Sequence, residues 1–323
     1  MSVLSTIQNQ KTGKQVKQTS FLRSQLILFQ SRKKWGLIYA LATLAGLFCI
    51  PQGTVAAASQ IDALVFVART LPLPLVSFAI IVGMYVLNDL VDADLDKANG
   101  KKRPIPTGKV SKRQVWAFVG LTNGTGILLA SLTFNPVSAV IALVIAAIGL
   151  MYSAPKISFK DRFVVKTLSI ALAMMLCALL GATSMFGLDL SGANLFVPAY
   201  MVLMLGTMIF ITSPFNDMGD IAGDKAAGRR TIPIVIGREN TVKMAIVLAT
   251  GMIAASWLFH GLGVVGLASA IAVSFVSSLA AVNIFKVLKK LDDVNYVRKK
   301  HTISYPLHIM LQSAIVIGVL LTW

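Results

Sequence analysis

Carboxylates are scarce in this sequence, and more than half of them fall in two short segments. Of the 13 Asp and Glu residues, four lie in residues 89–96 and three in residues 217–224. Aligned with an offset of 128, the two segments share one pattern, in which an Asn and two Asp residues are spaced four apart. The pattern comprises Asn88, Asp92 and Asp96, and then Asn216, Asp220 and Asp224. Two matching clusters predict a duplicated functional site rather than two unrelated solvated helix ends.

The spacing of these residues indicates which chemistry they can do. Residues four apart lie on one face of a helix, so each segment predicts a stripe of side-chain oxygens. Stacked carboxylates repel each other unless cations lie among them. Oxygen ligands in small number, completed by water and phosphate, suit Mg²⁺. Lys and Arg residues follow each segment and can hold phosphate oxygens beside the metal. The predicted chemistry is therefore the binding and ionisation of a diphosphate.

A calcium-binding EF-hand is the other interpretation of the first segment, because Asp92, Asp94 and Asp96 begin like a calcium loop. That interpretation is excluded by two later positions. Lys97 stands where the loop requires Gly, and Arg103 stands where it requires Glu.

The composition predicts that these segments lie in an all-α, polytopic membrane protein. Hydrophobic residues make up 56% of the 323 residues and charged residues only 13%, whereas soluble proteins carry about 25% charged residues. Disordered chains are poor in apolar residues, so disorder of the whole chain is excluded. Two cysteines in the chain exclude a secreted disulfide scaffold.

Nine apolar stretches are each near the length needed to cross a bilayer. They are residues 35–51, 71–88, 114–133, 137–153, 164–187, 195–215, 241–259, 262–285 and 303–323. If they alternate sides, 29 of the 30 Lys and Arg residues lie on one side, and Arg69 lies on the other. This bias predicts a cytoplasmic N-terminus, a C-terminus on the opposite side and, we expect, a prokaryotic cell membrane. It also explains the net charge of +17 without a nucleic-acid partner.

Two regions follow from this division. Residues 1–34 are expected to be a basic cytoplasmic tail, partly disordered, in which residues 21–34 can form an amphipathic helix on the membrane surface. Residues 35–323 are expected to form a nine-helix catalytic domain. The two acidic segments end spans two and six, which predicts an internal four-helix repeat of the kind common in membrane proteins built around a site.

The motifs resemble those of the UbiA superfamily of intramembrane prenyltransferases. The first acidic segment is followed by Arg103-Pro104-Ile105-Pro106-Thr107-Gly108, and the second by Lys225, Gly228 and Thr231-Ile232-Pro233. A Tyr-x-x-x-Lys element is also present, as Tyr152 and Lys156 at the end of span four. The resemblance covers residues 35–323. The spacer between Asp96 and Arg103 departs from the family pattern because it lacks the usual extra proline.

The resemblance implies a reaction and a set of roles. An isoprenyl diphosphate would bind through Mg²⁺, with Mn²⁺ as a substitute, and its prenyl group would pass to a lipophilic acceptor in the membrane lipid. One metal would be held by Asn88, Asp92 and Asp96, and the other by Asp220 and Asp224 with Asn216. The four aspartates, Tyr152 and Lys156 would be catalytic. The diphosphate would contact cations from the three motifs, namely Arg103, Lys156, Lys225, Arg229 and Arg230.

Four further polar residues are candidates for a pocket that holds the acceptor or the isoprenyl tail. Tyr85 lies one helical turn before Asn88, where an aromatic face can stabilise a carbocation. Ser304, His308 and Gln312 form a stripe at four-residue spacing on the last span. Polar groups inside a membrane often face a functional site, although helix packing and interhelical hydrogen bonds are alternative explanations.

Three functions remain open at this point. A prenyltransferase with a quinone precursor, a chlorin precursor or a glycerol-phosphate lipid as acceptor is the leading interpretation. A UbiA-type terpene cyclase would use the same ionisation. A transporter or lipid-binding protein with a duplicated cation site is disfavoured, because transporters place such sites near the bilayer midplane and these carboxylates lie at span ends.

Overall fold

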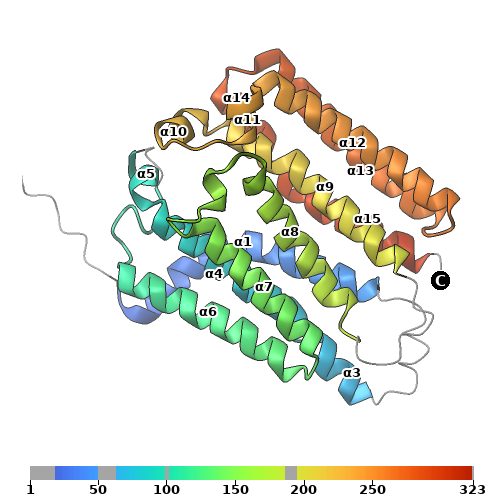
Figure 1. Cartoon of the computed structure of the whole chain (residues 1–323), viewed down its shortest axis with the longest axis horizontal. Coiled ribbons are helices and arrows are strands. Elements are labelled where there is room, and N and C mark those ends of the chain that lie inside the picture. Colours follow the sequence, from blue (N-terminus) through green and yellow to red (C-terminus); the bar gives the residue numbers. More distant parts are fainter. Residues whose placement is uncertain (1–18, 50–62, 99–101, 186–194, 322–323) are drawn as a thin grey trace, which may run out of the picture.

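The computed structural model describes residues 19–49, 63–98, 102–185 and 195–321, and all regular structure within them is helical. The expected all-α fold is thus confirmed. In these described ranges, nine long helices lie side by side in one bundle (Figure 1). They are α1 (Phe21–Phe48), α4 (Leu73–Val91), α6 (Lys112–Leu132), α7 (Pro136–Ser153), α8 (Phe163–Ala182), α9 (Phe196–Met218), α12 (Arg238–Gly261), α13 (Leu267–Phe285) and α15 (Ser304–Leu320).

Eight helices in the described part of the chain are long and apolar enough to cross a membrane, and they correspond to eight of the nine expected spans. The ninth, residues 35–51, falls largely in the second half of α1, which packs against α4, α8 and α15. The expected surface helix of residues 21–34 is the first half of the same uninterrupted helix. Residues 1–18 of the expected tail lie outside the described residues.

Large apolar side chains cover the outside of the bundle. On α6, for example, Trp116, Leu121, Leu128 and Leu132 are each more than half exposed. Apolar surface on this scale is unfavourable in water, whereas in hydrocarbon it is the expected outer face of a helix whose backbone hydrogen bonds are satisfied internally. The chain is therefore an integral, multi-pass membrane protein.

Two glycines let α1 and α8 approach until their backbones touch. A Cβ atom on Gly46 would lie 2.0 Å from the carbonyl oxygen of Ala178, and one on Gly181 would lie 2.0 Å from that of Thr43. Thr43 Oγ1 also donates a hydrogen bond to the Cys177 carbonyl at 2.8 Å. Small residues at such crossings are typical of helix pairs in membranes.

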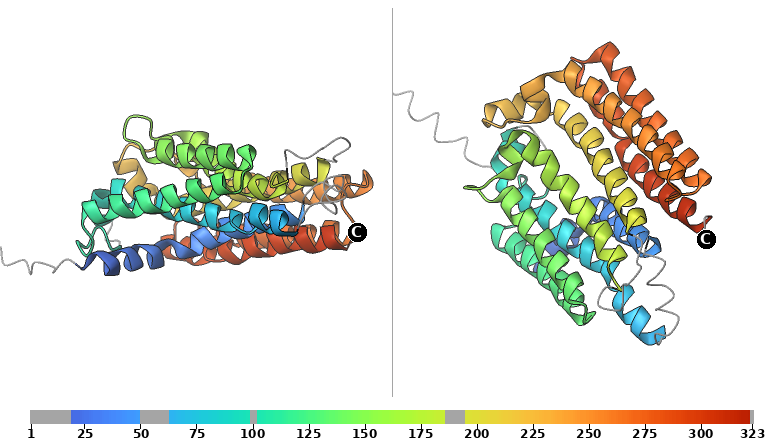
Figure 2. Two further views of the ribbon diagram at one scale, coloured as in Figure 1. Left: turned by 90° about the horizontal axis from the view of Figure 1, so that it is seen from below. Right: turned by 45° about the vertical axis from the view of Figure 1, so that its right-hand side comes forward.

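Short helices gather at one end of the bundle, opposite the end where α3 (Ala63–Thr70) and the C-terminus lie (Figures 1 and 2). They are α5 (Ala93–Ala98), η3 (Phe159–Asp161), α10 (Ile221–Ala226), α11 (Ile232–Ile236), η4 (Lys286–Lys290) and α14 (Val294–His301). Helices α6, α7 and α8 lie between α4 and α9 in the chain, and successive helices alternate in direction. Helices α4 and α9 therefore run in the same direction, and both end here. The fold thus brings the ends of the two acidic segments together.

Candidate functional site

Each acidic segment lies where a long helix gives way to a short one. Helix α4 ends at Val91 and α5 begins at Ala93, with Asp92 between them; α9 ends at Met218, and Asp220 precedes α10. The stripe expected on a continuous helix is therefore interrupted at the same point in both repeats. Backbone hydrogen bonds from Asp96 to Asp92, at 2.8 Å, and from Asp224 to Asp220, at 2.9 Å, keep the four-residue register beyond the break.

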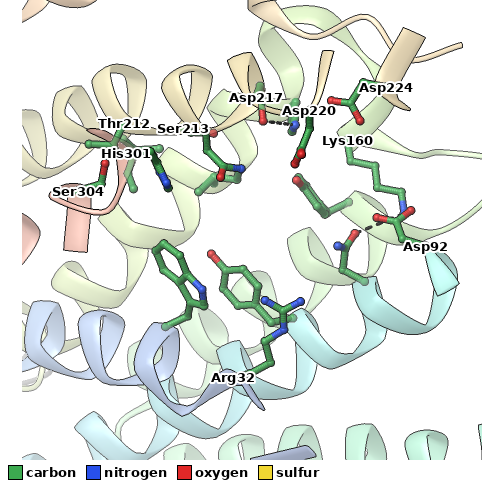
Figure 3. A pocket seen from close by; sticks show the side chains of 18 of the residues that line it. Arg32, Asp92, Lys160, Thr212, Ser213, Asp217, Asp220, Asp224, His301 and Ser304 are labelled. Atoms are coloured by element: carbon green, nitrogen blue, oxygen red, sulfur yellow. Dashed lines mark hydrogen bonds and ion pairs between the residues drawn. The ribbon is translucent and has the colours of Figure 1, made fainter. Parts of the chain in front are cut away.

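Both segments line one cavity of about 260 Å³ between α1, α4, α8, α9 and α15 (Figure 3). All six residues predicted as metal ligands line it, namely Asn88, Asp92, Asp96, Asn216, Asp220 and Asp224. Asp96 and Asp92 are buried, at 2% and 8% exposed, as is Asp224, whereas Asp220 is half-buried. Five cations line the same cavity: Arg32, Arg103, Lys160, Lys166 and Arg229.

Lys160 is the lysine that reaches the first acidic segment. Its Nζ donates to Asp92 Oδ1 at 2.7 Å and to Asn88 Oδ1 at 3.3 Å. The side chain is only 5% exposed, and it is presented by a tight turn in which Ser158 has a left-handed φ of 39°. Ser158 Oγ donates to Asp161, which closes the turn.

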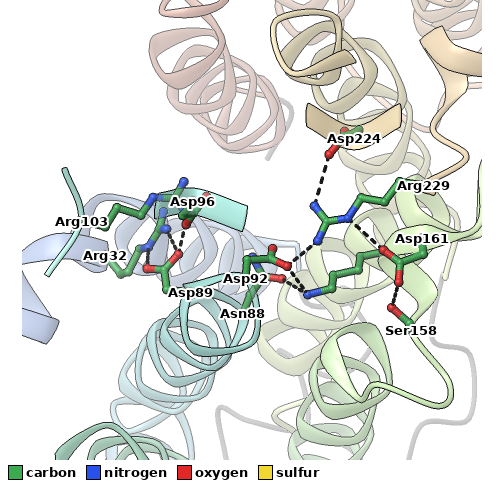
Figure 4. Close-up of polar contacts among 11 residues, drawn as sticks. Arg32, Asn88, Asp89, Asp92, Asp96, Arg103, Ser158, Asp161, Asp224 and Arg229 are labelled. Carbon is green, nitrogen blue, oxygen red and sulfur yellow. Dashed lines mark hydrogen bonds and ion pairs between the residues drawn. The ribbon is translucent and has the colours of Figure 1, made fainter. Parts of the chain in front are cut away.

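Arg229 links the two acidic segments across the cavity (Figure 4). Its guanidinium donates to Asp92 and to Asp224 Oδ1 at 3.2 Å, and its Nε forms an ion pair with Asp161 Oδ1 at 2.9 Å. Burial tends to raise the pKa of the Asp92 carboxyl, but Lys160 and Arg229 outweigh it and hold this pKa below its usual value. Burial tends to lower the pKa of Arg229, and Asp92 and Asp224 more than offset this. Asp92 and Arg229 are therefore both charged at neutral pH.

A second network lies at the edge of the cavity. Arg103 Nη1 donates to Asp96 Oδ2 at 2.5 Å and to Asp89 Oδ1 at 2.7 Å. Arg32, from α1, also donates to Asp89, through Nε at 2.6 Å and through Nη2. Arg103, for which the sequence predicts a diphosphate contact, therefore lines the cavity, and so does Arg32.

On the side of α8 and α9, Lys166 Nζ donates to Asp217 Oδ1 at 2.6 Å, and both side chains line the cavity. Sequence reasoning missed Arg32, Lys160 and Lys166 because each belongs to a basic cluster that topology alone explains. The only available signal was that Lys160 follows Lys156 by one helical turn.

Four predicted residues do not line this cavity. Lys156, Lys225 and Arg230 are exposed, and Arg230 contributes only its backbone N–H, to the Asp161 carbonyl at 2.9 Å. Gln312 is buried, but its Nε2 donates to the Ile38 carbonyl at 3.1 Å. Lys156 leaves the site because the chain turns after Pro155, so that Lys160 points inward instead.

The predicted residues Tyr85 and Tyr152 line the aromatic and apolar side of the cavity. Tyr85 stacks on Trp35, with ring centroids 5.7 Å apart, and Tyr152 lies beside it on the cavity wall. A second, apolar cavity of about 90 Å³ between α4, α7 and α8 shares Tyr85 and Tyr152 with the first. It therefore extends the site towards the hydrocarbon.

The wall formed by α9 and α15 is polar. Ser304 and His308 line it, and His308 Nε2 lies 3.1 Å from Thr212 Oγ1. Among the described residues, Ser304 Oγ and His308 Nδ1 are buried without a hydrogen-bond partner. Unpartnered buried polar atoms are costly, so these two atoms can take a hydrogen-bond partner from water or a ligand in the cavity. Figure 3 shows Ser304 and Thr212 on the opposite side of the cavity from Asp92.

The donors fit a hard divalent cation. Each acidic segment offers one amide oxygen and two carboxylates, the ligand type that Mg²⁺ takes, and Asp217 Oδ2 is buried without a partner among the described residues. No group of three His, Cys, Asp or Glu side chains in the described part of the chain is close enough to hold a metal ion by itself. A diphosphate would have to supply the other ligands, as the sequence predicts.

Comparison with known proteins gives concordant results. Residues 39–303 match the model of the UbiA prenyltransferase family. The digeranylgeranylglyceryl phosphate synthase of Thermococcus sibiricus is 31% identical over 173 residues, which are 54% of this chain and 58% of that protein. The match thus spans less than two thirds of that relative.

Solved structures share the fold. A structure of a digeranylgeranylglyceryl phosphate synthase has a TM-score of 0.66 at 20% identity, covering 93% of this chain and 99% of that chain. A UbiA homologue from Archaeoglobus fulgidus, bound to GPP and Mg²⁺, has a TM-score of 0.61 at 20% identity, covering 91% and 99%.

Proposed function

The chain belongs to the UbiA prenyltransferase family, and from this premise we propose that it is a Mg²⁺-dependent intramembrane prenyltransferase. It takes an isoprenyl diphosphate as donor and a glycerol-phosphate lipid as acceptor. The acceptor class is favoured over quinone and chlorin precursors because the Thermococcus sibiricus relative is a digeranylgeranylglyceryl phosphate synthase. The donor class is supported by the GPP and Mg²⁺ bound to the Archaeoglobus fulgidus homologue.

The observation that supports this function most strongly is the balance of charge in one buried cavity. Its lining contains five Lys or Arg side chains and five Asp side chains. A diphosphate alone would add uncompensated negative charge to this balanced site, at a high electrostatic cost in a region of low dielectric. Divalent cations that enter with the diphosphate offset that charge.

Asn88, Asp92 and Asp96 would hold one metal, and Asn216, Asp220 and Asp224 the other. The bound metals supply Lewis-acid stabilisation of the charge that grows on the departing diphosphate. Any of these aspartates that loses its Lys or Arg partner to the diphosphate becomes free to bind a cation instead.

The cations of the cavity bind and orient the diphosphate. Lys160 and Arg229 meet at Asp92, between the two acidic segments, and each can turn its N–H groups to a phosphate oxygen. We assign to Lys160 the diphosphate contact that the sequence predicted for Lys156. Donors already fixed in position stabilise the leaving group with little reorganisation.

The isoprenyl chain would lie in the apolar cavity between α4, α7 and α8, with its first carbon beside Tyr85 and Tyr152. The bond between that carbon and the diphosphate oxygen breaks, and the oxygen keeps the electron pair. The aromatic faces stabilise the allylic cation. An acceptor hydroxyl held by Ser304 then forms the new C–O bond, and its proton passes to His308 Nδ1.

Product analysis tests this function. The purified protein in nanodiscs would be incubated with Mg²⁺, geranylgeranyl diphosphate and one acceptor at a time: geranylgeranylglyceryl phosphate, 4-hydroxybenzoate or a chlorophyllide. Mass spectrometry should detect an ether product with the glycerol-phosphate lipid. An isoprenoid hydrocarbon formed without acceptor would indicate a terpene cyclase, and the absence of donor consumption would contradict the proposal.

A further inference from the structure

We propose that Asp89 and Asp217 are matched positioning residues, each of which holds a cation in place for the diphosphate. The proposal rests on the prenyltransferase function proposed above, and it gives a role to a third carboxylate in each acidic segment. These two aspartates sit at equivalent places in the repeat, directly after Asn88 and Asn216. Neither belongs to the four-residue stripes predicted to bind metal.

Asp89 lies behind two cations of the cavity. Its carboxylate is 2% exposed and does not line the cavity, whereas its partners Arg32 and Arg103 both do. Arg32 makes a two-point contact through Nε, at 2.6 Å, and Nη2. Such a contact fixes the plane of a guanidinium and occupies one edge of it, which leaves the other N–H donors for a ligand. Figure 4 shows Arg32 and Arg103 converging on Asp89.

Asp217, which itself lines the cavity, pairs with a lysine in the other half of the molecule. Lys166 Nζ lies 2.6 Å from Asp217 Oδ1, and the side chains of the two residues are 11% and 4% exposed. A buried ammonium without a partner is strongly unfavourable, so Asp217 allows Lys166 to stay charged inside the bundle.

The two pairs lie on corresponding helices of the repeat. Arg32 lies on α1, the long helix before α4, and Lys166 lies on α8, the long helix before α9. In each half these two helices pack against each other. Each half therefore contains the same unit, in which an Asp on the motif helix holds a cation from the preceding long helix.

A purely structural tie between helices is the competing explanation. Apolar residues of similar volume are generally as stabilising as a buried ion pair, or more so. A charged pair present in both halves, each with its cation on the cavity wall, fits a role in binding an anion. The two explanations differ in what happens when a whole pair is replaced by apolar residues.

The experiment uses two double variants, Arg32→Met with Asp89→Leu and Lys166→Met with Asp217→Leu, in the full chain in nanodiscs. Both should fold, as judged by size exclusion and Tm, because the pair is replaced as a unit. Turnover of geranylgeranyl diphosphate should fall by roughly 10²-fold, the KM for this donor and the inhibition constant of inorganic pyrophosphate should rise, and the KM for the acceptor should not change. Near wild-type kinetics in the folded double variants would overturn the proposal.

Single variants cover the case in which a double variant does not fold. Asp89→Asn and Asp217→Asn keep the shape and one hydrogen-bond acceptor, and the same rise in donor KM is expected. A lower Tm with unchanged donor kinetics would show a structural tie and overturn the proposal. The exposed Glu239, which pairs with Lys243 four residues on, provides the control Glu239→Gln. Absence of diphosphate release by the wild-type protein would instead refute the prenyltransferase function itself.

Discussion

Lys160 and Arg229 both donate to Asp92, so one carboxylate anchors cations from two segments that are far apart in the sequence. Removal of the Asp92 carboxylate would leave the buried Lys160 without its charged partner, which is costly. A bound diphosphate can accept the hydrogen bonds of Lys160 and Arg229, and a metal can bind the Asp92 carboxylate in their place. The side chains therefore need little movement to exchange one set of partners for the other.

The contrast between Lys160 and Lys156 gives a first prediction. Lys160→Ala should lower diphosphate release by roughly 10²-fold, because a donor to the leaving group is lost. Lys156→Ala should leave the rate within about twofold of wild type, since an exposed lysine at a span end acts mainly as a topology anchor. Rates of diphosphate release by the two purified, folded variants check this. Equal losses would contradict the assignment of Lys160.

The lowered pKa of Asp92 predicts how stability depends on pH. A carboxyl whose pKa is lower in the folded state stabilises the fold above its unfolded value of about 4, and the stabilisation is lost as pH falls through the folded value. The difference in Tm between wild type and Asp92→Asn should therefore be constant from pH 7 to pH 5 and shrink below pH 4. A difference that does not change down to pH 3 would contradict the ion-pair account.

Among the individual residues of the site, the acidic ones could be predicted from the sequence, whereas several of the Lys and Arg residues could not. Repetition at a fixed offset identifies Asn88, Asp92 and their counterparts without knowledge of the fold. Lys160 and Lys166 have no such signature, because the turn after Pro155 decides which lysine faces the cavity. Arg32 depends on how α1 crosses α4, which is a matter of packing.

The helices position these residues through close backbone contact. Helices α1 and α8 meet at Gly46 and Gly181, where an added Cβ atom would overlap a carbonyl oxygen of the partner helix. These are the helices that contribute Arg32 and Lys166 to the cavity. Their spacing therefore determines how far apart the two cations lie.

Substitution of these glycines gives a prediction at the scale of the element. Gly181→Ala should lower Tm and reduce turnover, because α1 and α8 must separate to admit the methyl group. Gly251→Ala on α12, where nothing lies within 4 Å of an added Cβ, should leave Tm unchanged or raise it, since Ala stabilises a helix by about 1 kcal/mol relative to Gly. Thermal unfolding of both variants in detergent tests this. A stable, fully active Gly181→Ala protein would contradict the close packing of α1 on α8.

Eight of the expected spans coincide with helices because apolar length alone determines them. The interruption of α4 at Asp92 was not predictable, since residues 88–96 contain neither Gly nor Pro. The interruption of α9 has a visible signal in Gly219, just before Asp220. The continuity of α1 through its basic residues was also missed, because charge suggested a boundary where the helix simply continues.

Among the residues that the structure describes, nearly all Lys and Arg side chains lie at the end of the bundle where the site lies. This asymmetry predicts that the site faces the cytoplasm. The two native cysteines are buried and free, so single exposed cysteines can report the orientation. Lys109→Cys, at the site end, should react with a membrane-impermeant maleimide only after the cells are opened. Leu262→Cys, which is exposed in the turn between α12 and α13, should react in intact cells, and the reverse pattern would contradict the topology.

The central claim is that the two acidic segments form a single metal-dependent site that ionises a diphosphate. The most direct measurement is the rate of pyrophosphate release from geranylgeranyl diphosphate, with its acceptor, by the wild-type protein and by Asp92→Asn, Asp224→Asn and the control Asp94→Asn. The account predicts a rate that requires Mg²⁺, is abolished by EDTA and falls by at least about 10²-fold in either of the first two variants. Asp94 is exposed, so its variant should keep the wild-type rate. Release that persists in EDTA, or a variant of either segment that is as active as Asp94→Asn, would contradict the claim.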